Sequence, residues 1–227
     1  MLKYSCVKKS FPLDLLEASC ALAYIREHAV ENDINPDDIT VLGFSAGGHL
    51  AASLAVHWNK SFVKTPLGFF KGEHRPNALA LAYPVISATD THQGSIDNLM
   101  CTDSYLTTSE ELKKHIIDDK SLDIGLLSKK ERENLISLEK NVSPDTPKAF
   151  IWHCSDDGCV PVSNSLRFAA ALNEHHIPFV LHVYQNGGHG GSLCDEVTAK
   201  EASQINEDAA GWMKLFTDWI YRKNLNE

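Results

Sequence analysis

The sequence predicts an α/β fold, in which a mostly parallel sheet is flanked by helices. Short apolar runs bounded by Gly, Pro or polar residues alternate with longer segments of helical periodicity, as in strands joined by helical crossovers. The chain has 227 residues, of which 43% are hydrophobic and 22% are charged. These values are typical of one globular domain with one substantial core, so we expect residues 1–227 to form a single domain.

The first half of the chain supplies two helices and two strands. A helix over 13–29 is indicated by apolar residues at helical spacing, namely Leu15, Ala18, Leu22, Ile25 and Ala29. The apolar run 39–43 predicts a strand, and the Ala- and Leu-rich run that follows predicts a helix over 50–56. A second strand is expected over 78–83, where Pro84 stops it because proline cannot donate a ladder hydrogen bond.

The second half supplies four further elements. They are a strand over 148–154, a helix over 162–174, a strand over 179–184 and a closing helix over 206–221. Pro144 and Pro147 mark the entry to the first of these strands. The closing helix carries apolar residues along one face that we expect to pack on the core, namely Trp212, Leu215, Phe216, Trp219 and Ile220.

Between the two halves lies a long polar and charged segment, from about residue 87 to 143. Two stretches within it are predicted to be helical, 109–118 and 128–140, and Ser128 with Glu131 has the sequence of a capping box. A connection of this length in a compact domain is usually functional. We therefore expect a helical, lid-like insertion, with a solvated surface excursion as the alternative.

The pentapeptide Gly43-Phe44-Ser45-Ala46-Gly47 stands between a predicted strand and a predicted helix. A serine in a G-x-S-x-G sequence at such a junction is typical of a nucleophile elbow, a strained turn that exposes the hydroxyl. The flanking glycines are expected because a Cβ there would collide with the neighbouring strand and helix. The alternative is a glycine-rich turn that holds an ordinary serine.

Two later strands also end in polar loops. The strand over 148–154 is followed by the carboxylates Asp156 and Asp157, and the strand over 179–184 is followed by a glycine-rich loop that presents His189. The carboxyl ends of parallel strands meet at one edge of a sheet, so the chain order serine, aspartate, histidine predicts a nucleophile, an orienting acid and a base at that edge. His182 and His153 lie inside strands, where a packed or half-exposed side chain is expected.

These motifs, taken together, resemble the acetyl esterase/lipase branch of the α/β-hydrolase superfamily, which includes carbohydrate (xylan-type) acetylesterases. The matching stretches occur in the same order over nearly the whole chain, at 35–39, 43–52, 83–86, 157–165 and 187–190. The resemblance implies an α/β-hydrolase fold, with Ser45 as nucleophile and His189 as base. It implies Asp157 as the acid because the family's acid stands three residues before the valine of a Val-Pro pair, here Val160-Pro161. Asp156 stays open as the alternative.

The resemblance also implies an oxyanion hole with two donors, one of them the backbone N–H of Ala46. The other donor comes, in this fold, from an upstream loop of His-Gly-Gly-Gly type, which the residues before Ser45 do not contain. Residues 2–7 resemble the end of the family's fourth strand, so we expect the fold to be N-terminally incomplete. A truncated chain is the favoured explanation; an unusual fold that closes the gap and a partner chain that supplies the missing part are the alternatives.

An incomplete sheet has a consequence for association. Without the family's third strand, the strand over 39–43 loses a hydrogen-bonding neighbour and presents an apolar edge. Exposed edges of this kind favour pairing with another chain. A homo-oligomer formed through this edge is therefore an expectation.

The function implied is a serine hydrolase that cleaves short-chain carboxylic (acetyl) esters through an acyl-enzyme, with carbohydrate esters among the candidate substrates. Two other interpretations stay open. The same residues serve peptidases of the prolyl-oligopeptidase kind and aryl formamidases, and a truncated hydrolase that lacks its oxyanion loop would be catalytically impaired.

Composition excludes several other classes. The net charge of −9 disfavours binding to nucleic acid and to anionic membranes, and no apolar run is long enough to span a bilayer. The N-terminal residues show no secretory signal, and the spacing of the six cysteines and the histidines predicts neither a metal site nor another cofactor. We expect a cytoplasmic protein with reduced thiols, including Cys154 and Cys159 on either side of the acid loop.

Overall fold

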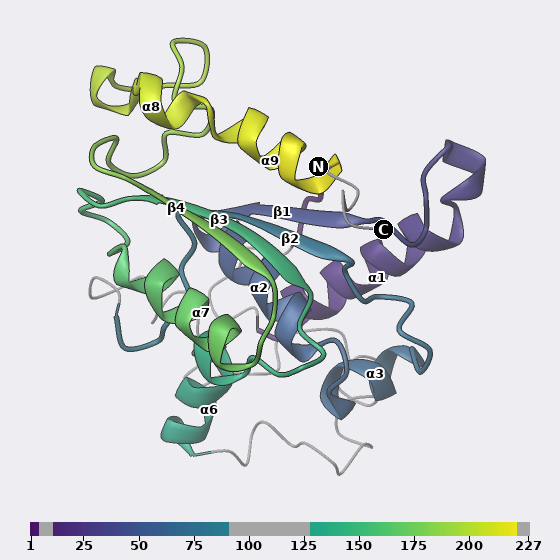
Figure 1. Ribbon diagram of the computed structural model, residues 1–227. Helices are drawn as coiled ribbons and strands as arrows, with labels where there is room; N and C mark the ends of the chain where they lie inside the picture. Colours follow the sequence, from purple (N-terminus) through teal and green to yellow (C-terminus); the bar gives the residue numbers. More distant parts are fainter. Residues whose placement is uncertain (5–10, 91–127, 222–227) are drawn as a thin grey trace.

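The computed structural model describes residues 1–4, 11–90 and 128–221 (Figure 1). Within them, four parallel strands form one sheet in the order β1-β2-β3-β4. Their bounds are Thr40–Phe44, Ala78–Ala82, Lys148–Cys154 and Phe179–Tyr184. Each strand boundary lies within one residue of the prediction, because continuous apolar runs bounded by polar residues are a direct signal of buried parallel strands.

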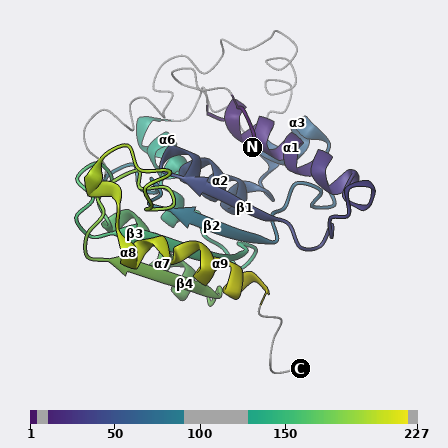
Figure 2. The same cartoon turned by 90° about the horizontal axis from the view of Figure 1, so that it is seen from above.

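Helices cover both faces of this sheet, as the α/β prediction requires (Figures 1 and 2). On one face lie α1, α2, α3, α6 and α7, with the bounds Leu13–Glu27, Ala46–His57, Ser61–Leu67, Lys129–Ile136 and Ser163–Glu174. On the other face lie α8 and α9, with the bounds Glu207–Ala210 and Trp212–Tyr221. Short 3-10 turns are present at Val30–Asn32, Leu138–Lys140 and Ala202–Gln204.

The core on the α2 face consists of two hydrophobic clusters. One lies between the sheet, α2 and α7, and includes Leu79, Ile151 and Phe168. The other joins α1, α2 and α3 through residues such as Leu15 and Leu54. The helix α2 lies between these two clusters, and every residue from 48 to 57 is buried.

The core on the α9 face is mainly aromatic. Trp152 of β3 stacks on Trp212 of α9 with ring centroids 5.4 Å apart, and both are buried. Phe216 and Trp219 pack against the same cluster, as predicted. Leu215, however, is 40% exposed, so its expected place on the packed face was wrong.

Several helix boundaries differ from the prediction. The closing helix is divided at Gly211 into α8 and α9, and the helix expected over 128–140 ends at Ile136. There Ser137 leaves the helical conformation, and its hydroxyl accepts a hydrogen bond from the backbone N–H of Ala88. The short helix α3 was not predicted, because its seven residues include Pro66.

The insertion is described only at its two ends, and the helix expected over 109–118 lies outside the described residues. At the C-terminal end, the capping box of Ser128 and Glu131 is confirmed at the start of α6. The other end of α6 is held to α2, because the imidazole Nε2 atoms of His49 and His57 lie 3.0 and 2.9 Å from the carbonyl oxygens of Ile136 and Leu135.

The strand β1 lies at one edge of the sheet, where it pairs with β2 and with no other strand among the described residues. Leu42 in β1 is 40% exposed. Of the strand expected over 2–7, residues 2–4 have no regular secondary structure and the rest lie outside the described residues. Across the parts of the chain that the structure describes, no helix is both long and apolar enough to cross a membrane.

Candidate active site

Ser45 occupies a sharp turn between β1 and α2. Its φ of 51° and ψ of −117° are rare for a residue with a side chain, and a backbone held in such a conformation stores strain. Three backbone hydrogen bonds fix it: the N–H of Ser45 donates to Ala82, and its carbonyl oxygen accepts from Val85 and His49. The serine is therefore held at the carboxyl end of the sheet, as the elbow prediction requires.

The glycines around the elbow are needed because of close backbone contacts. A Cβ on Gly43 would lie 2.2 Å from the carbonyl oxygen of Gly47, and a Cβ on Gly48 would lie 2.7 Å from the Cβ of Pro84. Both distances are far below van der Waals contact. Strand and helix can therefore approach closely enough to form the turn only if these positions carry no side chain.

This close approach predicts that Gly43→Ala destabilises the fold. We expect the free energy of unfolding to fall by about 3 kcal/mol or more, since the clash is with backbone atoms that cannot move independently. Urea denaturation followed by circular dichroism measures the effect. Gly211→Ala is a suitable control, because its φ is −72° and its Cβ would meet nothing closer than 3.8 Å. Equal stability of the two variants would contradict the steric explanation.

Three side chains from separate loops meet at the carboxyl end of the sheet. The hydroxyl Oγ of Ser45 lies 2.9 Å from Nε2 of His189, and Nδ1 of His189 lies 2.7 Å from Oδ2 of Asp157. The Asp157 side chain is fully buried, whereas that of His189 is 21% exposed. The structure thus brings together the three residues that the sequence analysis singled out.

Asp157 is surrounded by hydrogen-bond donors. Its Oδ1 accepts the backbone N–H groups of Cys159 at 2.9 Å and Val160 at 2.8 Å, and its Oδ2 faces imidazole nitrogens of His189 and His153. Burial alone would raise the pKa of Asp157, but the bonds from the two histidines and the two N–H groups together hold it well below its usual range. The carboxylate is therefore ionised at neutral pH.

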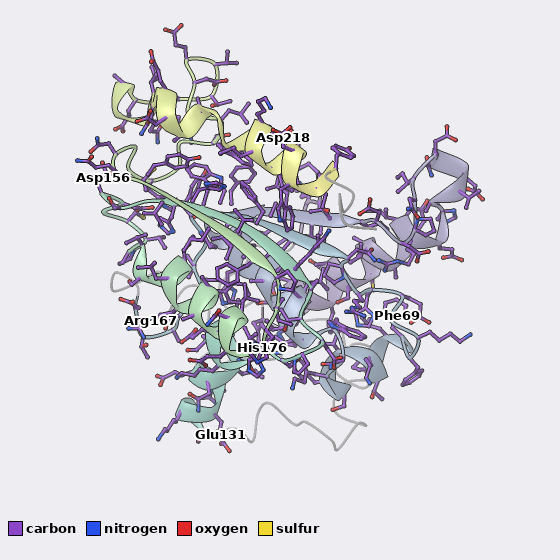
Figure 3. All side chains as sticks on the ribbon, in the orientation of Figure 1. Phe69, Glu131, Asp156, Arg167, His176 and Asp218 are labelled. Carbon is purple, nitrogen blue, oxygen red and sulfur yellow. The ribbon has the colours of Figure 1, made fainter. Side chains whose placement is uncertain are left out.

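Asp156, the alternative acid, contacts the backbone of the histidine loop instead. Its two carboxylate oxygens accept the N–H groups of Gly188 at 2.9 Å and Gly187 at 3.2 Å. In Figure 3 it lies at the end of the sheet where β3 stops. On the far side of the loop, Nε2 of Gln204 donates to the carbonyl oxygen of His189 at 2.9 Å. The imidazole is thus supported by loop contacts that the sequence analysis did not identify.

Tyr83 is another neighbour, which the sequence analysis placed at the end of a strand and in a matching stretch without assigning it a role. Its ring packs edge-on against His189, with centroids 5.0 Å apart, and its hydroxyl accepts the N–H of Ser192. It has a φ of 38°, and burial raises the pKa of its hydroxyl to about 12. Tyr83 therefore packs beside the imidazole as an uncharged side chain at neutral pH. The available signals were its position at the end of the predicted strand over 78–83 and in the matching stretch 83–86.

The residue predicted to donate to an oxyanion, Ala46, lies at the N-terminus of α2. Ala46 is the first residue of α2, so its N–H has no acceptor within the helix and lies at the positive end of the helix dipole. Nearby, the Tyr4 hydroxyl lies 3.9 Å from the position that a Cβ on Gly47 would take. This approach of Tyr4 to the elbow was not predicted.

The remaining candidates have structural contacts. His182 packs its ring against Phe150 and Tyr184, in agreement with its expected place in a strand. Cys154 and Cys159 are free thiols, as expected. Within residues 1–4, 11–90 and 128–221, no group of three or more His, Cys, Asp or Glu side chains is arranged to hold a metal ion.

A parallel sheet, a serine on a strained strand-to-helix turn, and Asp and His on later strand ends in that chain order define the α/β-hydrolase fold. The crystal structure of an acetyl ester-xyloside bifunctional hydrolase from Caldicellulosiruptor lactoaceticus is similar in fold, with a TM-score of 0.64 and 32% identity over 92% of this chain and 65% of that one. Residues 2–172 match the family model BD-FAE, and the chain belongs to this family.

Two curated proteins are similar in sequence. Endo-1,4-beta-xylanase B of Butyrivibrio fibrisolvens is 34% identical over 80% of this chain, and an acetylxylan esterase of Xylanibacter ruminicola is 28% identical over 84%. The aligned part is 25% of the first protein and 33% of the second. The chain thus spans no more than a third of the length of either relative.

Proposed function

We propose that this chain is a carboxylic ester hydrolase that cleaves short-chain acetyl esters with Ser45 as nucleophile, His189 as general base and Asp157 as the orienting acid. The observation that carries the proposal is the hydrogen-bonded series from Ser45 Oγ through both nitrogens of His189 to Asp157, at 2.9 and 2.7 Å. A serine hydroxyl is a weak nucleophile, and a base that is itself oriented by a carboxylate is what activates it.

The proposed reaction has two halves. In the first, Nε2 of His189 takes the Ser45 proton while Oγ attacks the ester carbonyl, and the oxyanion forms against the N–H of Ala46. The imidazolium then gives its proton to the leaving alcohol, and an acyl-serine remains. In the second half, His189 takes a proton from water as its oxygen attacks the acyl carbon. The bond to Oγ then breaks, the imidazolium returns the proton to Ser45, and the carboxylic acid leaves.

The substrate class is proposed from the relatives. One is named an acetylxylan esterase, another a xylanase, and a third an acetyl ester-xyloside bifunctional hydrolase. These names favour acetyl groups carried on a carbohydrate. The free thiols of Cys20, Cys154, Cys159 and Cys194 fit a reducing, cytoplasmic compartment, and the edge of β1 remains our proposed surface for self-association.

Hydrolysis of p-nitrophenyl esters tests the activity and the acyl preference together. We expect p-nitrophenyl acetate to have a higher kcat/KM than the octanoate, and acetate to be released from acetylated xylo-oligosaccharides. Mass spectrometry after treatment with diethyl p-nitrophenyl phosphate should place one phosphoryl group on the peptide that contains Ser45. A folded protein that neither hydrolyses acetate nor reacts with the phosphate ester would contradict the proposal. Cleavage of a dipeptide anilide in preference to the ester would favour a peptidase.

A further inference from the structure

His153 is a buried side chain that contacts the acid of the site and has no part in the proposed reaction. It is the last residue but one of β3 and is completely inaccessible to solvent. We propose, on the basis of the proposed function, that His153 is a positioning residue, which fixes the Asp157 carboxylate so that Oδ2 faces His189. A histidine inside a strand is ordinarily a packing residue, but the ring nitrogens of His153 make specific polar contacts.

The hydrogen-bond partners of His153 determine where its ring carries a hydrogen. Nε2 lies 2.9 Å from the carbonyl oxygen of Val160 and 3.2 Å from Oδ2 of Asp157. Both partners are pure acceptors, so Nε2 must carry the hydrogen and donate to them. Nδ1 lies 2.8 Å from the hydroxyl of Ser165, which can supply a hydrogen to it. Both ring nitrogens therefore have partners, and the ring orientation is fixed from two sides.

The Asp157 carboxylate accepts hydrogen bonds at both of its oxygens. Asp157 has about four acceptor directions, and four N–H donors meet it. The two backbone donors bind Oδ1 and would permit the group to tilt about that oxygen. Among the described residues, only His153 shares Oδ2 with His189, so it prevents Oδ2 from turning away from the imidazole. Its hydrogen also competes for the electron density of Oδ2, which keeps the proton between the two groups on Nδ1 of His189.

The chain contains a matched control for this proposal. His57 is also completely buried, and its Nε2 also lies 2.9 Å from a backbone carbonyl oxygen, that of Leu135. His57 is the last residue of α2, at the opposite end of that helix from Ser45. His153→Phe and His57→Phe therefore remove the same kind of bond from an equally buried ring, and only the first removes a donor from Asp157.

Two measurements on the full chain distinguish positioning from packing. For His153→Phe, we expect kcat for p-nitrophenyl acetate to fall about 10- to 100-fold per folded molecule, the equivalent of one bond to a charged group, with KM unchanged. His57→Phe should lose stability but keep the wild-type kcat. His153→Gln, whose amide N–H can replace the Nε2–H donor, should recover part of the loss.

The second measurement does not depend on turnover. A short N–H···O⁻ bond gives a low-field proton resonance, which we expect for His189 Nδ1 in the wild type. Its absence from Asp157→Asn would assign it, and it should be weakened in His153→Phe but unchanged in His57→Phe. An unaltered resonance in His153→Phe with kcat within about twofold of wild type would overturn the inference. Absence of turnover in the wild type with the resonance present and sensitive to His153 would refute only the proposed function.

Discussion

Replacement of Ser45 by alanine is expected to remove nearly all ester hydrolysis, with kcat reduced by about 10⁵- to 10⁶-fold. The loss is that large because Ser45 Oγ is the hydroxyl that lies in hydrogen-bonding distance of His189 Nε2 and is the proposed nucleophile. The substitution removes only Oγ, and the backbone bonds that hold the turn remain. Stopped assays with p-nitrophenyl acetate, together with thermal denaturation, measure activity and stability separately.

The matched substitution is Ser155→Ala. Ser155 also follows a strand, and its hydroxyl donates to the carbonyl oxygen of Gln185 at 2.9 Å rather than to His189. We expect this variant to keep its activity within about threefold, since it makes no contact with the reacting groups. Serine-independent turnover in Ser45→Ala would show that another nucleophile or a directly activated water performs the reaction.

Replacement of Asp157 by asparagine is the second large effect that we expect. The amide group cannot accept bonds from all four N–H donors, so its NH₂ must face either the backbone or an imidazole. An amide NH₂ directed at His189 favours the wrong tautomer, with the proton on Nε2, where it blocks proton transfer from Ser45. A loss of about 10⁴-fold in kcat follows, as for the corresponding change in the chymotrypsin-type triad.

Asp156→Asn is the comparison that tests this assignment. Asp156 accepts two backbone N–H groups of the histidine loop, and an asparagine oxygen can still accept at least one of them. We expect a loss of less than about tenfold in kcat and a modest loss of stability. The reverse ranking of the two variants, measured at equal folded fraction, would identify Asp156 as the orienting acid.

Most of the sheet could be predicted because its strands are short, apolar and bounded by polar residues or proline. The helices were less predictable where their ends depend on tertiary contacts. The helix α2 begins at Ala46 rather than at residue 50, since Gly47 and Gly48, which read as a turn, are required for close packing against β1 and β2. Similarly, Ile25 has helical spacing but is 42% exposed, because periodicity does not show how wide the contact face is.

The residues of the site also fall into those that the sequence could predict and those that it could not. Ser45, Asp157 and His189 could be found because each follows a strand in a recognisable motif, and the structure places all three in hydrogen-bonding contact. The supporting contacts of His153 and Asp156 could not be predicted from the sequence, because both depend on how the loops fold back on the strand ends. His153 lies four positions before Asp157 and contacts it because the chain turns at Ser155 and Asp156, directly after β3 ends.

The burial of α2 has a consequence for how the proposed hydrolase could accommodate different substrates. A helix enclosed by other elements along residues 48–57 has almost no freedom to shift, so Ser45, which precedes it, is effectively immobile. Adaptation to a larger alcohol or a longer acyl group must then come from the loops around Ser45. Selection for a new specificity would therefore be expected to change these loops and to leave the scaffold beneath the serine intact.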